Sequence, residues 1–168
     1  MKTLTIVLLS TISLTVNAQD MKDITQKVSQ LFVATDNREW DKVEAFFADE
    51  VELDYSSMNG NPAVKLSPKQ IIDSWKTILP GFSSTHHQVG NFISKVNENT
   101  ADVFCYGTAT HFLEHEDGNV WIVVGSYNFE LKKNVNNWKV TKMKFNFKYM
   151  EGNINLPQAA MDNVKAKQ

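Results

Sequence analysis

Two of the four histidines in the chain fall where alternating strand patterns would turn them toward a common interior. Histidine can both accept and release a proton near neutral pH, so a pocket that holds two of them could carry out acid–base chemistry. His87 shares a predicted strand face with Val89, and His111 shares one with Cys105 and Ala109. The alternation therefore predicts that His87 and His111 line one pocket.

Small side chains in the middle of one strand are the reason to expect a cavity. Cys105, Gly107 and Ala109 occupy one predicted face, and a close-packed interior does not normally leave such volume unfilled. A third run places Ser126 and Asn128 together, and we expect this face to point into the same space. Polar groups that converge in an apolar cavity are typical of small-molecule sites.

Simpler interpretations of the histidines stay open. A strand histidine is more often an ordinary core or surface residue than a catalyst. His86 should face away from His87, and His115 lies beside a predicted hairpin turn. A metal site would need three or four ligands at fixed geometry, which these spacings do not indicate, so we expect no metal and no cofactor.

Three helices are predicted in the N-terminal half of the chain. Apolar residues at helical spacing mark the first over 24–33. A capping box of Asp36 and Glu39 would open a second helix over 36–47, and a serine cap followed by proline opens a third over 67–79. If Asp36 caps its own helix, its carboxylate has a structural role rather than a role in the pocket.

The second half of the chain is predicted to be a sheet. After an early strand over 51–55, four longer runs cover 85–96, 101–114, 120–132 and 138–149, separated by short turns rich in Asn, Asp or Gly. Helices that precede a long antiparallel meander indicate an α+β domain, with the helices packed on one face of a curved sheet.

The two ends of the chain are expected to lie outside this domain. Residues 1–19 have the basic start, apolar run and small residues of a secretory signal peptide, and the run is short for a membrane span. The alternative is an uncleaved membrane anchor. Residues 20–152 would form the domain, and 153–168 a tail in which a short helix could cover the pocket. We therefore expect an exported protein, periplasmic or secreted, without membrane contact after cleavage.

Composition excludes several classes of function. The 168 residues carry a formal net charge of −2, which argues against a protein that binds nucleic acid through clustered Lys and Arg. The single cysteine excludes an intramolecular disulfide and any multi-cysteine metal site. A hydrophobic fraction of 42% argues against intrinsic disorder.

Several short segments recur in the same order in one known family. Residues 85–90 (Thr-His-His-Gln-Val-Gly) are similar to its Thr-Gln-His-x-x-Gly strand, and 126–129 (Ser-Tyr-Asn-Phe) to its Ser-Ala-Asn-Leu. Residues 36–41 (Asp-Asn-Arg-Glu-Trp-Asp) and 53–57 (Leu-Asp-Tyr-Ser-Ser) resemble Asp-Ser-Lys-Asp-Trp-Asp and Ile-Asp-Tyr-Arg-Ser. The chain thus resembles the SnoaL-like, or nuclear transport factor 2-like, family, and its closest functional likeness is to scytalone dehydratase. This resemblance implies a cone-shaped curved antiparallel sheet with three N-terminal helices on its concave side.

The resemblance implies a catalytic set of His87, His111, Asp36 and Tyr55. The family's catalytic histidine maps onto His87, and its second histidine onto His111, with which Asp36 would pair. Tyr55 maps onto a tyrosine that holds a water on the substrate, and Thr35 stands where the family has another such tyrosine. The candidate substrate-binding residues are Asn128, Ser126, Val89, Ala109, Cys105 and Trp40.

Such a set predicts a cofactor-independent lyase or isomerase, which by acid–base catalysis would dehydrate a small cyclic hydroxy ketone or shift a proton next to its carbonyl. The alternative is a non-catalytic exported module that binds a small apolar molecule, since a fold does not fix a function. A homo-oligomer, either a dimer or a trimer, is also expected, because aromatic residues are predicted on the outer sheet face. These residues are Phe104, Tyr106, Tyr127, Phe129, Phe145 and Phe147.

Overall fold

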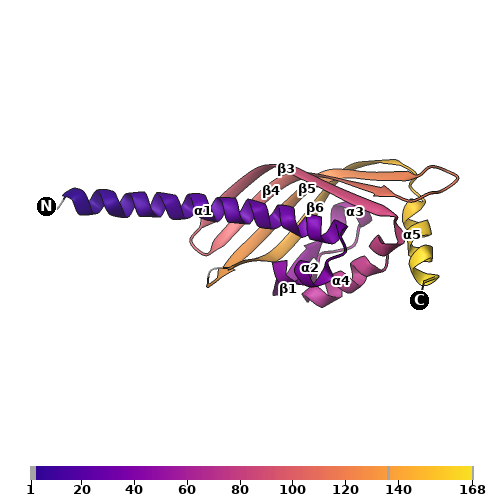
Figure 1. Ribbon diagram of the computed structural model, residues 1–168, viewed down its shortest axis with the longest axis horizontal. Coiled ribbons are helices and arrows are strands. Elements are labelled where there is room, and N and C mark those ends of the chain that lie inside the picture. The colour runs from indigo at the N-terminus through magenta and orange to yellow at the C-terminus, as the bar shows by residue number, and fades with distance from the viewer. Residues whose placement is uncertain (1–2, 136, 168) are drawn as a thin grey trace.

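Helices cover one side of a curved, unclosed six-stranded sheet in the computed structural model, which describes residues 3–135 and 137–167 (Figure 1). This arrangement confirms the predicted α+β class. In chain order the elements are α1 (Thr3–Asp36), α2 (Trp40–Phe46), β1 (Phe47–Asp54), α3 (Ser56–Asn59), β2 (Val64–Leu66), α4 (Pro68–Lys76), the 3-10 turn η1 (Leu79–Gly81), β3 (Ser84–Asn97), β4 (Thr100–Phe112), β5 (Val120–Asn134), β6 (Asn137–Gly152) and α5 (Leu156–Lys165).

The strand order in the sheet is β2-β1-β6-β5-β4-β3. Strands β3 to β6 form the antiparallel meander that the turn residues predicted. Strand β1 pairs with β6 in parallel, so the sheet is not antiparallel throughout. No hairpin constrains this pair, since about half of the chain lies between the two strands.

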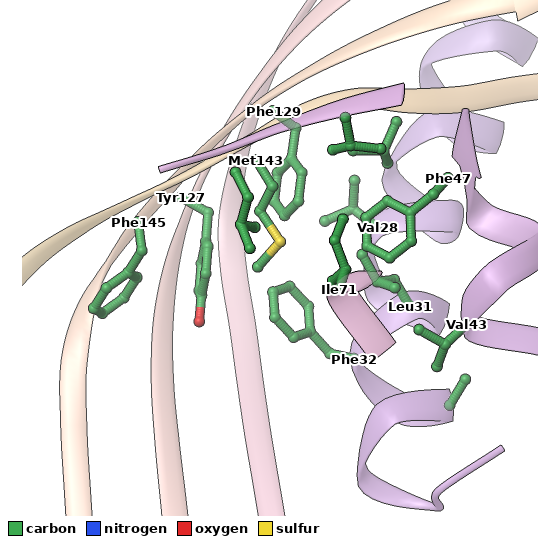
Figure 2. Packing of buried hydrophobic residues seen from close by; sticks show 14 of the residues in the cluster. Val28, Leu31, Phe32, Val43, Phe47, Ile71, Tyr127, Phe129, Met143 and Phe145 are labelled. Carbon is green, nitrogen blue, oxygen red and sulfur yellow. The ribbon is translucent and has the colours of Figure 1, made fainter. Parts of the chain in front are cut away.

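The core lies between α1 and the concave face of the sheet. Ile24, Val28 and Leu31 are fully buried on the inner face of α1. Figure 2 shows Phe129 and Met143 pointing from the sheet toward the helical layer. The helical spacing recognised in the sequence therefore marks the face that covers the sheet.

The predicted outer face of the sheet is wrong for three aromatic residues. Tyr127, Phe129 and Phe145 are buried on the inner face (Figure 2). Tyr127 and Phe129 pack against Phe32 of α1, and Phe145 packs against Tyr127. The pairing register explains the difference, because Tyr127 lies directly opposite Cys105 and residues directly opposite in a sheet share a face.

Two predicted helix starts have different outcomes. Ser67 accepts a hydrogen bond from the Gln70 backbone N–H, which confirms the predicted serine cap of α4. The Gln70 side chain accepts a hydrogen bond from the Ser67 backbone N–H in return, so the two residues form a capping box. The capping box of Asp36 and Glu39 is wrong. Asp36 ends α1, α2 begins at Trp40, and no side chain caps α2.

The two ends of the described chain are helical. Helix α1 continues through the boundary expected near residue 20, and its first half extends beyond the sheet (Figure 1). No helix in the described part of the chain combines the length and apolar character that a bilayer crossing requires. At the other end, Leu156 and Ala160 of α5 are fully buried beside η1, although α5 does not line the cavity described below.

Candidate functional site

A cavity of about 250 Å³ opens between the helices and the concave face of the sheet. Its walls are mostly aliphatic and aromatic, and no lysine or arginine of the described chain lines it. Helices α1, α3 and α4, the turn η1 with the residue before it, and strands β1 and β3 to β6 all contribute. The lining residues are Phe32, Thr35, Leu53, Tyr55, Met58, Ser74, Trp75, Ile78, Leu79, His87, Ala109, His111, Trp121, Val123, Tyr127, Met143 and Phe145.

A histidine–carboxylate pair forms one wall of this cavity. His87 Nδ1 lies 2.7 Å from Asp36 Oδ1, and both side chains are largely buried. Because the carboxylate only accepts hydrogen bonds, Nδ1 carries the proton and Nε2 is left as a base. The ring of His87 stacks on Phe32 at a centroid distance of 5.3 Å, which fixes its plane.

The Asp36 carboxylate receives two further hydrogen bonds. The Thr85 hydroxyl donates to Oδ1 over 2.8 Å, and the backbone N–H of His87 donates to Oδ2 over 2.7 Å. Burial raises the pKa of Asp36, but the bonds from His87 and Thr85 outweigh it and hold the pKa below its ordinary value. Asp36 is therefore an anion near neutral pH that orients the His87 ring.

The predicted pairing of Asp36 with His111 is wrong. Asp36 at the end of α1 lies beside the start of β3 and contacts His87. The ring centroids of His87 and His111 are 5.9 Å apart. His111 Nδ1 instead faces the backbone carbonyl oxygen of Trp121 over 3.3 Å. The residue is buried, and burial together with the nearby His87 lowers the pKa of His111 to about 4. His111 is thus neutral at pH 7 and cannot serve as the protonated acid.

Two tyrosine hydroxyls are available in the cavity. Tyr55 follows β1 and lines the cavity as predicted, and burial raises its pKa well above the ordinary value. Tyr127 of β5 lines it as well, and burial raises its pKa too. Both phenols therefore stay protonated and can donate a hydrogen bond to a ligand.

Sequence reasoning missed Tyr127, although a signal for it was present. A Cβ added to Gly107 would lie 2.4 Å from the Tyr127 ring, so the glycine on β4 makes room for a large neighbour. The small residues of β4 thus do not simply leave a void. Of Cys105, Gly107 and Ala109, only Ala109 lines the cavity, whereas Cys105 is fully buried elsewhere in the core.

Several predicted substrate-binding residues lie outside the cavity. Asn128 is exposed on the convex face and accepts a hydrogen bond from Asn146, and Ser126 shares this face. The β5 register that turns Tyr127 inward turns both of them outward. Val89 and Trp40 pack against the core without lining the cavity.

Thr35 does line the cavity, but its hydroxyl is already used. It donates to the Leu31 carbonyl oxygen within α1 over 2.8 Å. It therefore has no proton left with which to hold a water on a ligand.

No group of three His, Cys, Asp or Glu side chains in the described residues is arranged to hold a metal ion. The cavity wall itself offers side-chain proton donors and acceptors, among them His87, His111, Tyr55 and Tyr127.

Solved structures with this fold cover most of the chain. A protein from Kribbella flavida, Kfla4162, has a TM-score of 0.78 at 20% identity, covering 86% of this chain and 98% of its own. A protein provisionally assigned as a scytalone dehydratase from Novosphingobium aromaticivorans has a TM-score of 0.68 at 20% identity, over 82% and 89% of the two chains. The hexachlorocyclohexane dehydrochlorinase LinA-type3 from Novosphingobium barchaimii has a TM-score of 0.69 at 14% identity, over 82% and 92%. At these identities the similarity shows the fold.

No protein with curated function matches the sequence. The model of the SnoaL-like domain matches residues 16–144, which is most of the chain. The order of elements, the curved unclosed sheet and the cavity under it are consistent with that match. This protein belongs to the SnoaL-like family, within the nuclear transport factor 2-like superfamily.

Proposed function

We propose that the protein is a cofactor-independent lyase or isomerase that removes a proton from carbon in a small, uncharged cyclic substrate. The observation that carries this proposal is the His87–Asp36 pair at the wall of an apolar cavity. A relative in fold is named as a dehydrochlorinase, and another is provisionally assigned as a dehydratase. Both reaction classes remove a proton from carbon.

His87 is the base in this proposal. Its Nδ1–H is held by Asp36, so the lone pair of Nε2 is available, and the anionic partner favours the imidazolium that forms after proton transfer. For a hydroxy ketone the proton comes from the carbon next to the carbonyl. The developing oxyanion would accept hydrogen bonds from Tyr55 or Tyr127, whose raised pKa keeps them protonated.

The same imidazole completes the elimination. His111 is neutral, and its one N–H faces the Trp121 carbonyl oxygen, so Nε2 has no proton to give to a leaving hydroxide at pH 7. His87 holds the proton that it took from carbon, and returning that proton to the leaving oxygen releases water and forms the C=C bond. His111 Nε2 would then act as a hydrogen-bond acceptor that orients a substrate hydroxyl.

The wall of the cavity limits the substrate. Since no cationic side chain of the described chain lines it, a carboxylate or phosphate would lose its hydration without a counter-charge. A volume of about 250 Å³ suits a compact ring system rather than a long chain.

The test is an elimination assay without added cofactor on a panel of small cyclic β-hydroxy ketones, which follows enone absorbance. We expect turnover by the native chain and a loss of about 10²- to 10⁴-fold in His87→Gln, the range typical of a general base. His86→Gln is the matched control, because His86 is exposed and its side chain faces away. Equal turnover in His87→Gln and the native chain would overturn the proposal.

The panel also decides between catalysis and binding alone. Saturable binding of the ketones, with no turnover of any of them and no change in binding in His87→Gln, would favour the non-catalytic binding module.

Export and self-association are two further proposals. We propose that residues 1–19 are removed on export, which mass spectrometry of the periplasmic or secreted protein would test. We also propose a dimer or trimer through the outer sheet face, where Tyr106 and Tyr149 are about half exposed. Light scattering of the purified domain would contradict the second proposal if it gave the mass of one chain.

A further inference from the structure

Behind the His87–Asp36 pair lies a layer of polar groups that does not reach the cavity. It consists of Thr85 at the start of β3 and Arg38 in the turn after α1. Neither residue lines the cavity, so neither is placed to touch a ligand. Both are joined to Asp36 by an unbroken chain of hydrogen bonds.

The first link of the chain fixes one hydroxyl proton. Arg38 Nη1 donates to Thr85 Oγ1 over 2.8 Å, and Thr85 Oγ1 lies 2.8 Å from Asp36 Oδ1. A guanidinium has no acceptor, so the threonine oxygen accepts on that side and its single proton is directed at the carboxylate. Thr85 is buried, which limits the access of water that would compete for this proton.

The second link fixes the guanidinium itself. Arg38 Nη1 also faces the carbonyl oxygens of Thr35 and Asp36 over 2.9 and 3.1 Å, and Nη2 donates to the Leu79 carbonyl over 2.6 Å. Arg38 therefore ties the end of α1 to β3 and to the cavity wall. Its positive charge also lies at the C-terminal end of α1, where the helix dipole favours a cation.

The choice of residue matches this geometry. Arg38 is the only arginine in the chain, and every other basic residue is lysine. The planar guanidinium of arginine can donate to acceptors on three segments at once, whereas the ammonium group of lysine is a compact donor at the end of a flexible side chain. The backbone of Arg38 has φ of 60°, a left-handed conformation that a non-glycine residue adopts only when its surroundings hold it there.

We propose that Thr85 and Arg38 are positioning residues of the His87–Asp36 pair. Arg38 directs the Thr85 hydroxyl, and Thr85 holds the Asp36 carboxylate in the orientation that places Oδ1 on His87 Nδ1. The kinetic part of this inference rests on the proposed function, whereas the hydrogen-bond part does not.

The first experiment needs no substrate. Proton NMR of the native chain is expected to show a downfield His87 Nδ1–H resonance, assigned by its absence in His87→Gln. Thr85→Val should weaken or shift this resonance and move the Asp36 carboxyl titration toward higher pH, because the hydroxyl bond lowers the pKa of Asp36. Thr85→Ser restores the hydroxyl and should restore both signals.

Thr110→Val is the matched control. Thr110 is a half-buried strand threonine opposite His86, on the face away from the cavity. It should leave the resonance and the titration unchanged. Thermal melting of all variants separates a local effect from a loss of folding. A Thr85→Val protein that melts like the Thr110→Val protein but keeps the native resonance and titration would overturn the proposal.

The second experiment measures kinetics. Thr85→Val should lower kcat by about tenfold or more, as expected from losing one hydrogen bond to a charged group, with KM little changed. Arg38→Lys should lower kcat in the native background and much less in the Thr85→Val background, because Arg38 acts through Thr85.

Equal losses for Arg38→Lys in both backgrounds would overturn the link between Arg38 and Thr85. If no member of the ketone panel is turned over, the proposed function fails, but the NMR signals still decide whether these residues position the pair.

Discussion

His87 and His111 face one cavity with ring centroids 5.9 Å apart, yet their surroundings give them different chemistry. His87 Nδ1 meets a carboxylate that is itself held by Thr85 and a backbone N–H. His111 Nδ1 meets only a backbone carbonyl, and Phe82 and Trp121 pack against its ring. The hydrogen-bond partner of Nδ1, on the side away from the cavity, thus determines the chemistry that is available to each imidazole.

The two histidines have different partners because they lie at different places in the sheet. His87 lies near the start of β3, where the end of α1 brings a charged side chain within reach. His111 lies near the end of β4 and opposite Trp121 of β5, so its nearest hydrogen-bonding group belongs to the sheet. One histidine has an anionic partner that fixes its tautomer, and the other is desolvated and stays neutral.

The largest effect is expected from Asp36→Asn, which would give His87 a neutral partner like that of His111. The amide can donate to Nδ1 and reverse the tautomer, so that Nε2 carries the proton and no longer acts as a base. We expect kcat to fall by about 10⁴-fold, in line with the same substitution in a catalytic Asp–His pair. Stopped-flow or steady-state enone formation would measure it, and a loss below threefold would contradict the role of Asp36.

The second prediction concerns acid stability and isolates His111. Its pKa is about 4 in the folded chain and about 6.5 in an unfolded one, so the unfolded state binds the proton first. The contribution of His111 to stability is therefore complete above pH 6.5 and is lost as the pH falls toward 4. The loss amounts to about 3 kcal/mol at most.

Urea denaturation at pH 7.5, 5.5 and 4.5 would measure this loss, and His111→Phe should flatten the profile in that window. The carboxylates do not interfere, because the pKa values of Asp36 and Asp54 are lowered and their stabilisation is lost only below about pH 4. An unchanged slope in His111→Phe would show that another group causes the acid sensitivity.

The sequence alone was enough to predict the fold class and to predict that His87 and His111 line one cavity. Helical spacing over 24–33, the Ser67 cap and the turn residues of the meander predicted the α+β domain, since these signals are local. The alternation also predicted that His87 and His111 face the same cavity. Local patterns in single strands carried that prediction without knowledge of the pairing.

What could not be predicted depends on register and on distant contacts. The inward face of β5 follows from Cys105 lying opposite Tyr127, and an error of one residue exchanged Tyr127 for Ser126 and Asn128. The partner of Asp36 depends on where α1 ends relative to β3. The capping-box pattern in the sequence favoured a role for Asp36 within its own helix. In the fold its carboxylate instead binds His87, which lies 51 positions further along the chain.

The third prediction tests whether His111 acts as a hydrogen-bond acceptor for the substrate. His111→Phe keeps the ring volume and removes the nitrogen that faces the cavity. We expect a loss of about tenfold in kcat/KM for a hydroxy ketone, the size of one neutral hydrogen bond. A matched ketone without the hydroxyl should bind the native and variant chains equally. If it loses the same affinity, packing rather than hydrogen bonding explains the effect.

The smallest effect is expected at Thr35, which lines the same cavity but has its hydroxyl committed to the Leu31 carbonyl. That carbonyl already has a place in the α1 hydrogen-bond ladder, so Thr35→Val leaves no strong acceptor without a partner. We expect less than a threefold change in kcat/KM and less than about 1 kcal/mol in the free energy of unfolding. His87 and Thr35 would then show that a polar residue on a cavity wall serves the ligand only through a donor or acceptor that the fold has not already used. A tenfold or larger loss in Thr35→Val would mean that the hydroxyl turns from the Leu31 carbonyl to the ligand. Thr35 would then have to be counted among the ligand-binding residues, together with His87.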